Sequence, residues 1–243
     1  MRYKMIFAYD GSYFKGFQRQ KNLKTIQGEL EKILSKVNDS KVEITGCGRT
    51  DTGVHAINSV AHFNLDKDIK IYNLKKHLNT NLDGEVYIKD IIKVNDDFYA
   101  RYDAIEKEYR YFINIKEFNL FQKNYIYQYN KDLDIKKMEK ALKILLGEHD
   151  FRSFCKGEKD KENCVRTITL TEIIEKDNII EIRIVGNGFL RQMVRNIVGV
   201  LIEIGSGKKD ITYMKETLDR KNREKIIKPA SSCGLYLWDV KYK

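Results

Sequence analysis

The sequence predicts an α+β protein with a mostly antiparallel sheet, on the evidence of three patterns in its 243 residues. Apolar and polar side chains alternate over residues 3–9, which is typical of a strand with one buried face. Apolar residues recur at helical spacing behind Thr25. Two strand-like segments flank Lys176-Asp177-Asn178, which favours a hairpin. Strands mixed with helices through hairpin-like connections are typical of the α+β class.

Each element is expected for a local reason. Thr25 and Asp134 each stand before a helical pattern and are suited to be N-caps, while Gly147 and Gly205 are typical helix ends. The strands are expected where apolar residues alternate. We therefore expect helices at 26–37, 73–78, 135–145, 189–204 and 211–218, and strands at 3–9, 42–45, 59–63, 85–94, 107–115, 167–174, 179–185 and 234–240.

The predicted elements fall into two similar halves, 1–103 and 104–243. Each half runs through a strand, a helix and a pair of strands, which suggests an internal duplication, although the sequence identity between the halves is too low to prove it. No stretch has the composition of a flexible linker. The polar, lysine-rich segment 155–163 is typical of a surface loop.

The charge balance favours a polyanionic partner. Lys and Arg number 45 against 35 Asp and Glu, which gives a formal net charge of +10. Nucleic acid is the first candidate and an anionic membrane the second, while solubility alone also accounts for such a charge. The 15 Tyr and 11 Phe argue against a disordered chain, and the single Pro excludes a collagen-like one.

The sequence gives no sign of export or of a metal site. The apolar stretch 197–202 is far too short to span a bilayer, and the N-terminus lacks the apolar run of a signal peptide. We therefore expect a cytoplasmic protein with reduced thiols. Paired zinc-ligand spacing is absent among the four cysteines, which are Cys47, Cys155, Cys164 and Cys233.

One segment, Gly46-Cys47-Gly48-Arg49-Thr50-Asp51-Thr52-Gly53-Val54-His55-Ala56, carries the strongest chemical signal. Its three glycines allow the backbone to turn tightly and to approach a ligand closely. Arg49 and Asp51 stand between them on a loop that follows a predicted strand, where catalytic groups are often found. On these residues alone, a surface turn with an Arg49–Asp51 ion pair is an equally good interpretation.

This segment resembles the catalytic motif of the tRNA pseudouridine synthase A (TruA) family. The other motifs of that family follow in order over nearly the whole chain, which is more specific than any single motif. Two positions depart from the usual pattern: Thr52, where the family usually has Ala, and Phe17, where it usually has Trp. The matching motifs are 9–12, 16–20, 48–51, 97–102, 107–111, 147–151, 193–199 with Phe189, and 234–237.

The resemblance implies the isomerisation of uridine to pseudouridine at up to three neighbouring uridines of the tRNA anticodon stem-loop. It implies tRNA as the partner and a homodimer as the assembly, with no role for membrane or DNA. No metal, redox cofactor or nucleoside triphosphate is expected. The implied fold is the pseudouridine synthase fold, in which two RRM-like halves share an extended, mostly antiparallel sheet flanked by helices, with a central catalytic cleft.

The resemblance also assigns three catalytic residues: Asp51, Arg195 and Tyr109. A carboxylate suits covalent catalysis, but whether Asp51 attacks the base, attacks the sugar or removes a proton stays open. Arg195 would pair with Asp51 and favour its ionised form. Tyr109 would stack on the uracil or transfer a proton. Both residues could also have no catalytic role: Arg195 as an exposed helix arginine, and Tyr109 as an ordinary core tyrosine.

Further residues are expected to contact RNA. The resemblance implies that Arg49 enters the RNA stem beside the flipped nucleotide, where its planar guanidinium can stack or bind phosphate. It also implies contacts from the segment Phe98, Tyr99, Ala100, Arg101 and Tyr102. Weaker candidates for phosphate contacts are Arg19, Lys156, Lys159, Lys161, Lys208 and Lys209.

Three other functions compete with this interpretation. A dinucleotide-binding enzyme is suggested by Gly186-Asn187-Gly188, but Arg191 stands where the third glycine of the fingerprint belongs. A non-catalytic RNA-binding protein on the same scaffold would need no Asp51, and the chain lacks an aromatic RNP1 signature. A related synthase with a different RNA target is the third alternative.

Overall fold

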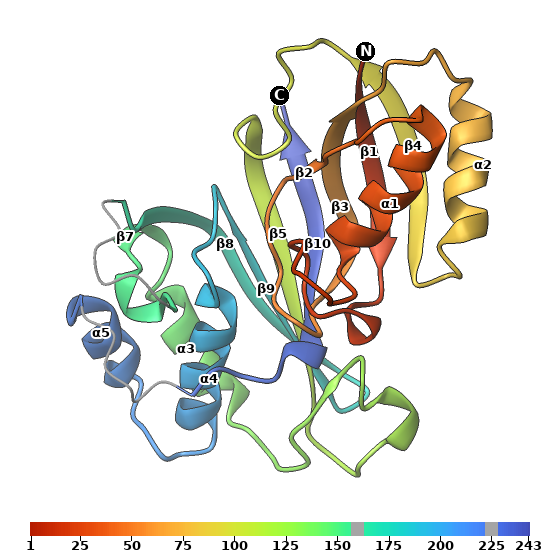
Figure 1. Ribbon diagram of the computed structural model, residues 1–243. Helices are drawn as coiled ribbons and strands as arrows, with labels where there is room; N and C mark the ends of the chain where they lie inside the picture. The colour runs from red at the N-terminus through yellow and green to blue at the C-terminus, as the bar shows by residue number, and fades with distance from the viewer. Residues whose placement is uncertain (157–162, 222–227) are drawn as a thin grey trace. The chain divides into compact units, whose positions relative to one another are not determined.

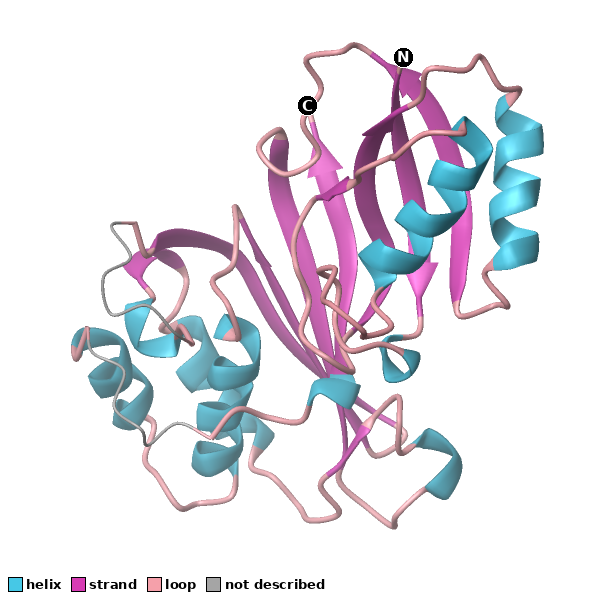
Figure 2. Cartoon of the chain, in the orientation of Figure 1, coloured by secondary structure: helices cyan, strands magenta, loops and turns pink. Residues whose placement is uncertain are grey.

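The computed structural model describes residues 1–156, 163–221 and 228–243. The chain forms two compact units, Met1–Ile105 with Tyr236–Lys243, and Glu106–Leu235. Helices and mostly antiparallel strands occur in both units (Figure 2), which confirms the predicted α+β class. The first unit ends close to the expected limit at residue 103, but it also includes the last strand, which the sequence placed with the C-terminal half.

The first unit is a sheet with two helices across one face (Figure 1). Its strands follow the order β4-β1-β3-β10, with β2 paired to β3, and these pairs are antiparallel except β3–β10. The elements are β1 (Arg2–Tyr9), α1 (Ile26–Asn38), β2 (Thr45–Gly46), β3 (His55–Asn64), α2 (Ile71–Asn81), β4 (Val86–Val94) and β10 (Leu235–Tyr242).

The core of this unit lies between the sheet and its helices. Alternate residues of β1 are buried, and Met5 and Phe7 are fully so. Leu30 and Leu34 of α1 are buried one turn apart. Each such side chain stabilises the fold by roughly 1.5–3 kcal/mol. The helix begins where the Thr25 hydroxyl accepts a hydrogen bond from the Gly28 amide, as its predicted N-cap role requires.

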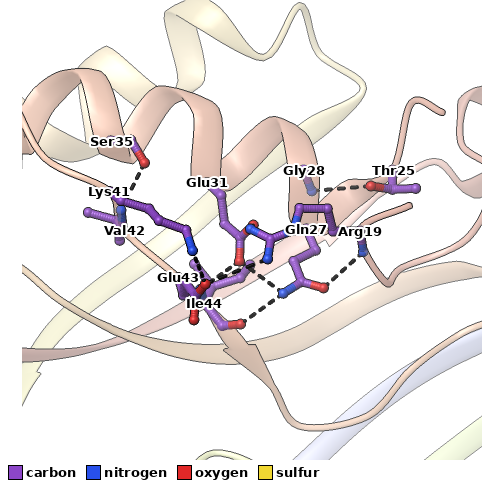
Figure 3. Close-up of polar contacts among 10 residues, drawn as sticks. All are labelled: Arg19, Thr25, Gln27, Gly28, Glu31, Ser35, Lys41, Val42, Glu43 and Ile44. Carbon is purple, nitrogen blue, oxygen red and sulfur yellow. Dashed lines mark hydrogen bonds and ion pairs between the residues drawn. The ribbon is translucent and has the colours of Figure 1, made fainter. Parts of the chain in front are cut away.

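A buried carboxylate, Glu31, ties α1 to the two segments that flank it (Figure 3). Its Oε1 accepts hydrogen bonds from the Ile44 amide at 3.0 Å and from Gln27 Nε2 at 2.9 Å. Its Oε2 accepts from Arg19 Nη1 at 2.8 Å. The predicted strand 42–45 is wrong except at its last residue, because backbone groups there bond to side chains of α1: the Val42 amide bonds to Ser35 Oγ, and the Ile44 amide to Glu31.

The second unit repeats the arrangement of a sheet with helices. Its strands follow the order β5-β9-β8-β7 in antiparallel pairs, and β6 runs parallel to β5. The predicted hairpin at 176–178 is confirmed. The elements are β5 (Ala104–Asn114), β6 (Tyr127–Gln128), α3 (Ile135–Lys143), β7 (Gly147–Asp150), β8 (Val165–Lys176), β9 (Ile179–Gly186), α4 (Met193–Gly205) and α5 (Thr212–Asp219).

Helix α4 begins later than the spacing predicts, at Met193 instead of residue 189. The residue before it, Gln192, has a φ of 60°, in the left-handed region. A residue in that conformation cannot continue a right-handed helix, so the helix begins immediately after it. The expected N-cap of α3 is confirmed, because Asp134 Oδ1 accepts from the Lys137 amide at 3.0 Å.

A second buried carboxylate, Glu108, organises the polar face of β5 and β9. Arg183 donates two hydrogen bonds to its two oxygens, at 2.9 and 3.0 Å, and Arg110 Nε donates a third at 2.7 Å. Arg110 continues the network to Glu181 at 2.8 Å. Burial acts to raise the pKa of Glu108, but the hydrogen bonds from Arg183 and Arg110 outweigh it, and the pKa lies below its ordinary value.

Replacement of Glu31 by alanine should destabilise the protein by about 2 kcal/mol, because it leaves the buried Ile44 amide without its acceptor. Urea unfolding at neutral pH measures the change. Glu43→Ala is the matched control, since Glu43 is exposed and pairs with Lys41 and Arg19 at the surface. Its cost should stay within about 0.5 kcal/mol, and equal costs for the two variants would contradict the role given to Glu31.

Replacement of Glu108 by glutamine should cost about 1–3 kcal/mol at pH 7. Because the pKa of Glu108 is lowered in the folded state, its stabilisation is present above the unfolded value of about 4.3 and disappears as the pH falls through the folded value. The free energies of unfolding of wild type and variant should therefore converge in acid. Urea titrations between about pH 7 and pH 3 test this, with exposed Glu117→Gln as control; parallel curves would refute it.

Candidate active site

The loop that carries Asp51 lies between β2 and β3 and is shaped by backbone hydrogen bonds. The Cys47 amide donates to the Val60 carbonyl at 2.7 Å, and the Val54 amide closes a turn onto the Asp51 carbonyl at 3.2 Å. Gly53 has a φ of 77° within this turn, which glycine adopts without strain. The turn presents a partly exposed Asp51 at its first position.

This loop is clamped to the N-terminal segment of the chain. The Tyr9 hydroxyl lies 2.8 Å from Thr50 Oγ1 in a buried contact, and the Phe17 amide donates to the Thr50 carbonyl at 3.1 Å. A Cβ on Gly11 would overlap the Val54 backbone, so only glycine allows this approach. Two of the predicted motifs, 9–12 and 16–20, therefore serve as the support of a third.

Phe17 fills the place where tryptophan is usual. It is 3% exposed, and its ring lies directly over Gly46, where a Cβ would overlap it. Its centroid is 6.5 Å from that of Tyr9. The departure from the family pattern at this position therefore lies in the packing beneath the start of the Asp51 loop.

Arg49 lies on the exposed side of the same loop. Its Nη1 donates to Gln18 Oε1 at 2.8 Å, which ties the guanidinium to the N-terminal segment. An exposed guanidinium held at one end is well suited to stack on a base or to contact a phosphate.

The segment 98–102 divides into an anchor and an exposed part. Ala100 is fully buried: its amide donates to His62 Nδ1 at 3.1 Å, and its carbonyl accepts from the Tyr242 hydroxyl at 2.6 Å. Burial, and secondarily the charge of Arg2, lowers the pKa of His62, which favours the neutral ring that this bond requires.

The exposed part of this segment is aromatic and basic. Tyr102 is 72% exposed and stacks on Tyr99 with centroids 4.8 Å apart. The Arg101 guanidinium lies 5.6 Å from the Tyr102 ring, within cation–π range. Arg101 and Tyr102 are therefore placed to meet a ligand, whereas Ala100 is a structural residue.

Tyr109 lies in the second unit, on β5. It is buried to 9% exposure, pairs with Ile184 of β9 and meets the Phe189 ring edge-on, with centroids 5.0 Å apart. Strand alternation places Tyr109 and Tyr111 on the face opposite Glu108. Phe189 therefore packs against the Tyr109 ring and restricts its orientation.

Arg195 lies in the first turn of α4 and is partly exposed. Its Nε donates to the Ala230 carbonyl at 2.8 Å, and its own carbonyl accepts from the Ala230 amide at 2.9 Å. Arg195 is therefore held in place, which differs from the exposed helix arginine of the non-catalytic alternative.

The structure divides the weaker candidates for phosphate contacts into residues that pair with carboxylates and residues that are exposed. Arg19 pairs with Glu31 and Glu43, and Lys208 lies 3.8 Å from Glu203. Lys156 and Lys209 are exposed. The remaining two candidates, Lys159 and Lys161, lie outside the described residues.

The supporting roles of His62, Glu108 and Tyr111 escaped the sequence reasoning, although the motif 107–111 includes the last two. Their pattern in the sequence is that of ordinary strand residues, and their partners lie far away along the chain. Within the described residues, no cluster of three His, Cys, Asp or Glu side chains is arranged to hold a metal ion. In that same part of the chain, no helix is both long and apolar enough to cross a membrane.

Comparisons with known proteins agree with these motifs. The family model described as tRNA pseudouridine synthase matches residues 5–103 and 141–243. A tRNA pseudouridine synthase A 1 of Bacillus cereus is 43% identical over 243 residues, which covers 99% of this chain and 98% of the relative. A tRNA pseudouridine synthase A of a Geobacillus species is 41% identical, again over 99% and 98% of the two chains.

Among solved structures, a chain of an H/ACA ribonucleoprotein bound to a substrate RNA matches 83% of this chain and 44% of its own length. Its identity is 12% and its TM-score is 0.39, so it adds nothing to the assignment. The near full-length matches, together with motifs whose residues support one another in the structure, show that the chain belongs to the tRNA pseudouridine synthase family.

Proposed function

We propose that this protein isomerises uridine to pseudouridine in tRNA. The observation that carries the proposal is the loop of Asp51, a carboxylate on a glycine-rich turn that the chain clamps through Tyr9, Gly11 and Phe17. A catalytic group must be held in one geometry, and a clamped loop with a partly exposed carboxylate meets that need. The relatives that match over their full length are named for this reaction.

Asp51 acts as the nucleophile or as the base, while Arg195 pairs with it and favours its ionised form. Tyr109 stacks on the target uracil or transfers a proton. Arg195 is supported in this role by its two bonds to Ala230, and Tyr109 by its contact with Phe189. The isomerisation breaks the N1–C1′ bond and forms a C5–C1′ bond, so no redox equivalent is consumed.

Arg49, Arg101 and Tyr102 bind the RNA around the target nucleotide. All three are exposed, and each offers a planar group that stacks on bases. Extrusion of a uridine costs a few kcal/mol of lost stacking, which such contacts can offset. The Tyr99 ring stacks on the Tyr102 ring and helps to hold it in place.

The substrate proposed is the anticodon stem-loop of tRNA, and the assembly proposed is a cytoplasmic homodimer. Both follow the family resemblance, and the net charge of +10 supports an RNA partner. Pseudouridine mapping in tRNA from cells that lack this protein identifies the target uridines.

Substitution of Asp51 by asparagine should lower turnover by about 10³-fold or more, because the amide is neither nucleophile nor base. Release of tritium from tRNA labelled at uridine C5 measures turnover, and filter binding measures affinity. Affinity for tRNA should stay within about twofold of wild type, and the control Asp68→Asn, at an exposed position, should leave both unchanged. Retained turnover in Asp51→Asn would reject the proposal.

Affinity for tRNA should fall steeply with salt, by about 10²-fold or more between roughly 50 and 200 mM KCl, because bound phosphates release counterions. Replacement of the exposed Arg101 by glutamine should reduce the slope of log Kd against log salt by about one. Filter binding across the salt series gives both values. An affinity that does not change with salt would contradict binding through phosphate contacts.

A further inference from the structure

The segment Lys228–Gly234, which we call the strap, lies against α4 and is attached to it through Arg195. Two hydrogen bonds join Arg195 and Ala230 in opposite directions. The Ala230 amide donates to the Arg195 carbonyl at 2.9 Å, and Arg195 Nε donates back to the Ala230 carbonyl at 2.8 Å. One strap residue therefore holds both the backbone and the side chain of Arg195.

A glycine one turn further along α4 lets the strap approach this closely. A Cβ on Gly199 would lie closer than 3.0 Å to the Lys228 carbonyl oxygen, and 3.6 Å from the Ala230 amide nitrogen. Because the group it would strike is backbone, the strap itself would have to move. Glycine weakens a helix interior relative to alanine, so its presence here calls for a reason, and the approach of the strap supplies one.

The strap is fixed from its other side by β5. The hydroxyl of the fully buried Tyr111 donates to the Ser231 carbonyl at 2.7 Å. Burial raises the pKa of Tyr111 well above its ordinary value, so the phenol keeps the proton that it donates. A Cβ on Gly234 would overlap the Phe112 carbonyl oxygen and lie tightly against the Tyr111 ring.

These contacts determine which edge of the Arg195 guanidinium can serve a reaction. Arginine presents its N–H donors in a rigid planar fork. With Nε bound to Ala230, only the Nη end of the fork can reach another acceptor without breaking that bond. The strap thereby sets the plane and the direction of the charged end, and a displacement of about 1 Å at such a site can lower a rate by about 10²-fold.

We propose that the strap is a positioning element of the reaction: it aims the Arg195 guanidinium, and Gly199 and Tyr111 hold it in place. The proposal rests on the proposed function, since it takes Arg195 to act on Asp51. Gly199, Ala230 and Tyr111 touch no reacting group in this scheme and act through Arg195.

The test is Gly199→Ala, measured by single-turnover tritium release and by filter binding to tRNA. The rate should fall by about 10²-fold while Kd stays within about twofold, because the strap moves the cation and not the RNA-binding residues. Gly28→Ala is the matched control: its Cβ would also crowd a helix contact, but the group it meets is the Thr25 hydroxyl that caps α1, not the strap. It should cost stability while its rate stays within about twofold.

Tyr111→Phe is the second variant, and it keeps the ring while removing the bond to Ser231. It should lower the rate by about threefold to tenfold at unchanged Kd, and it guards against a failure of Gly199→Ala to fold. In an Arg195→Lys background, where no Nε–H binds the strap, Gly199→Ala should change the rate by less than about twofold. Such non-additivity separates positioning from a general loss of stability.

The outcomes are distinct. A wild-type protein that releases no tritium overturns the proposed function and this inference with it. Active wild type, with Gly199→Ala and Tyr111→Phe at the wild-type rate, overturns the inference alone. So does a rate loss that is equal in the Arg195→Lys background, because the strap would then act without Arg195.

Discussion

The contact between the Tyr9 hydroxyl and Thr50 Oγ1 is the constraint on which the proposed chemistry depends. It joins the end of the first strand to the residue before Asp51, and the Phe17 amide adds a second bond to the same threonine. A loop after a strand would otherwise sample several conformations, at a cost in ordering it for each turnover. Here that cost is met during folding, because Cys47, Thr50 and Val54 of the loop are buried in the core of its unit.

Side chains also fix irregular segments at Arg195 and along α1. In each case a polar side chain bonds to backbone groups of a segment that has no regular structure: Arg195 to Ala230, and Glu31 to Ile44. Such segments cannot satisfy their amides and carbonyls through a helix or a sheet, so side chains supply the missing hydrogen-bond partners. At Arg195 the same contact both satisfies the backbone of Ala230 and fixes a residue of the proposed site, so a stabilising contact there also serves the proposed function.

The sequence predicted those parts of the fold that have local causes. The alternation in β1, the hairpin at 176–178 and the cap at Asp134 each depend on residues within a few positions, and each is confirmed. The segment 42–45 fails because its backbone partners, Ser35 and Glu31, come from a neighbouring helix that periodicity cannot reveal. For the site, the motif locates the loop of Asp51, but nothing local shows that Tyr9 or Phe17 holds it.

The amino-acid composition does not show which basic side chains are paired inside the protein and which are exposed. Part of the basic content is bound internally: Arg110 and Arg183 share the buried Glu108, and Arg19 is bound to Glu31. Ion pairing offsets much of the charge of these arginines, so each adds less to the field around the protein than an unpaired cation would. Under the proposed function, exposed groups such as Arg49, Arg101 and Lys156 are the ones left to attract RNA. Some arginines of this chain therefore stabilise the fold, and others are available to a ligand. The arginine content of the sequence does not distinguish the two groups, but their hydrogen-bond partners do.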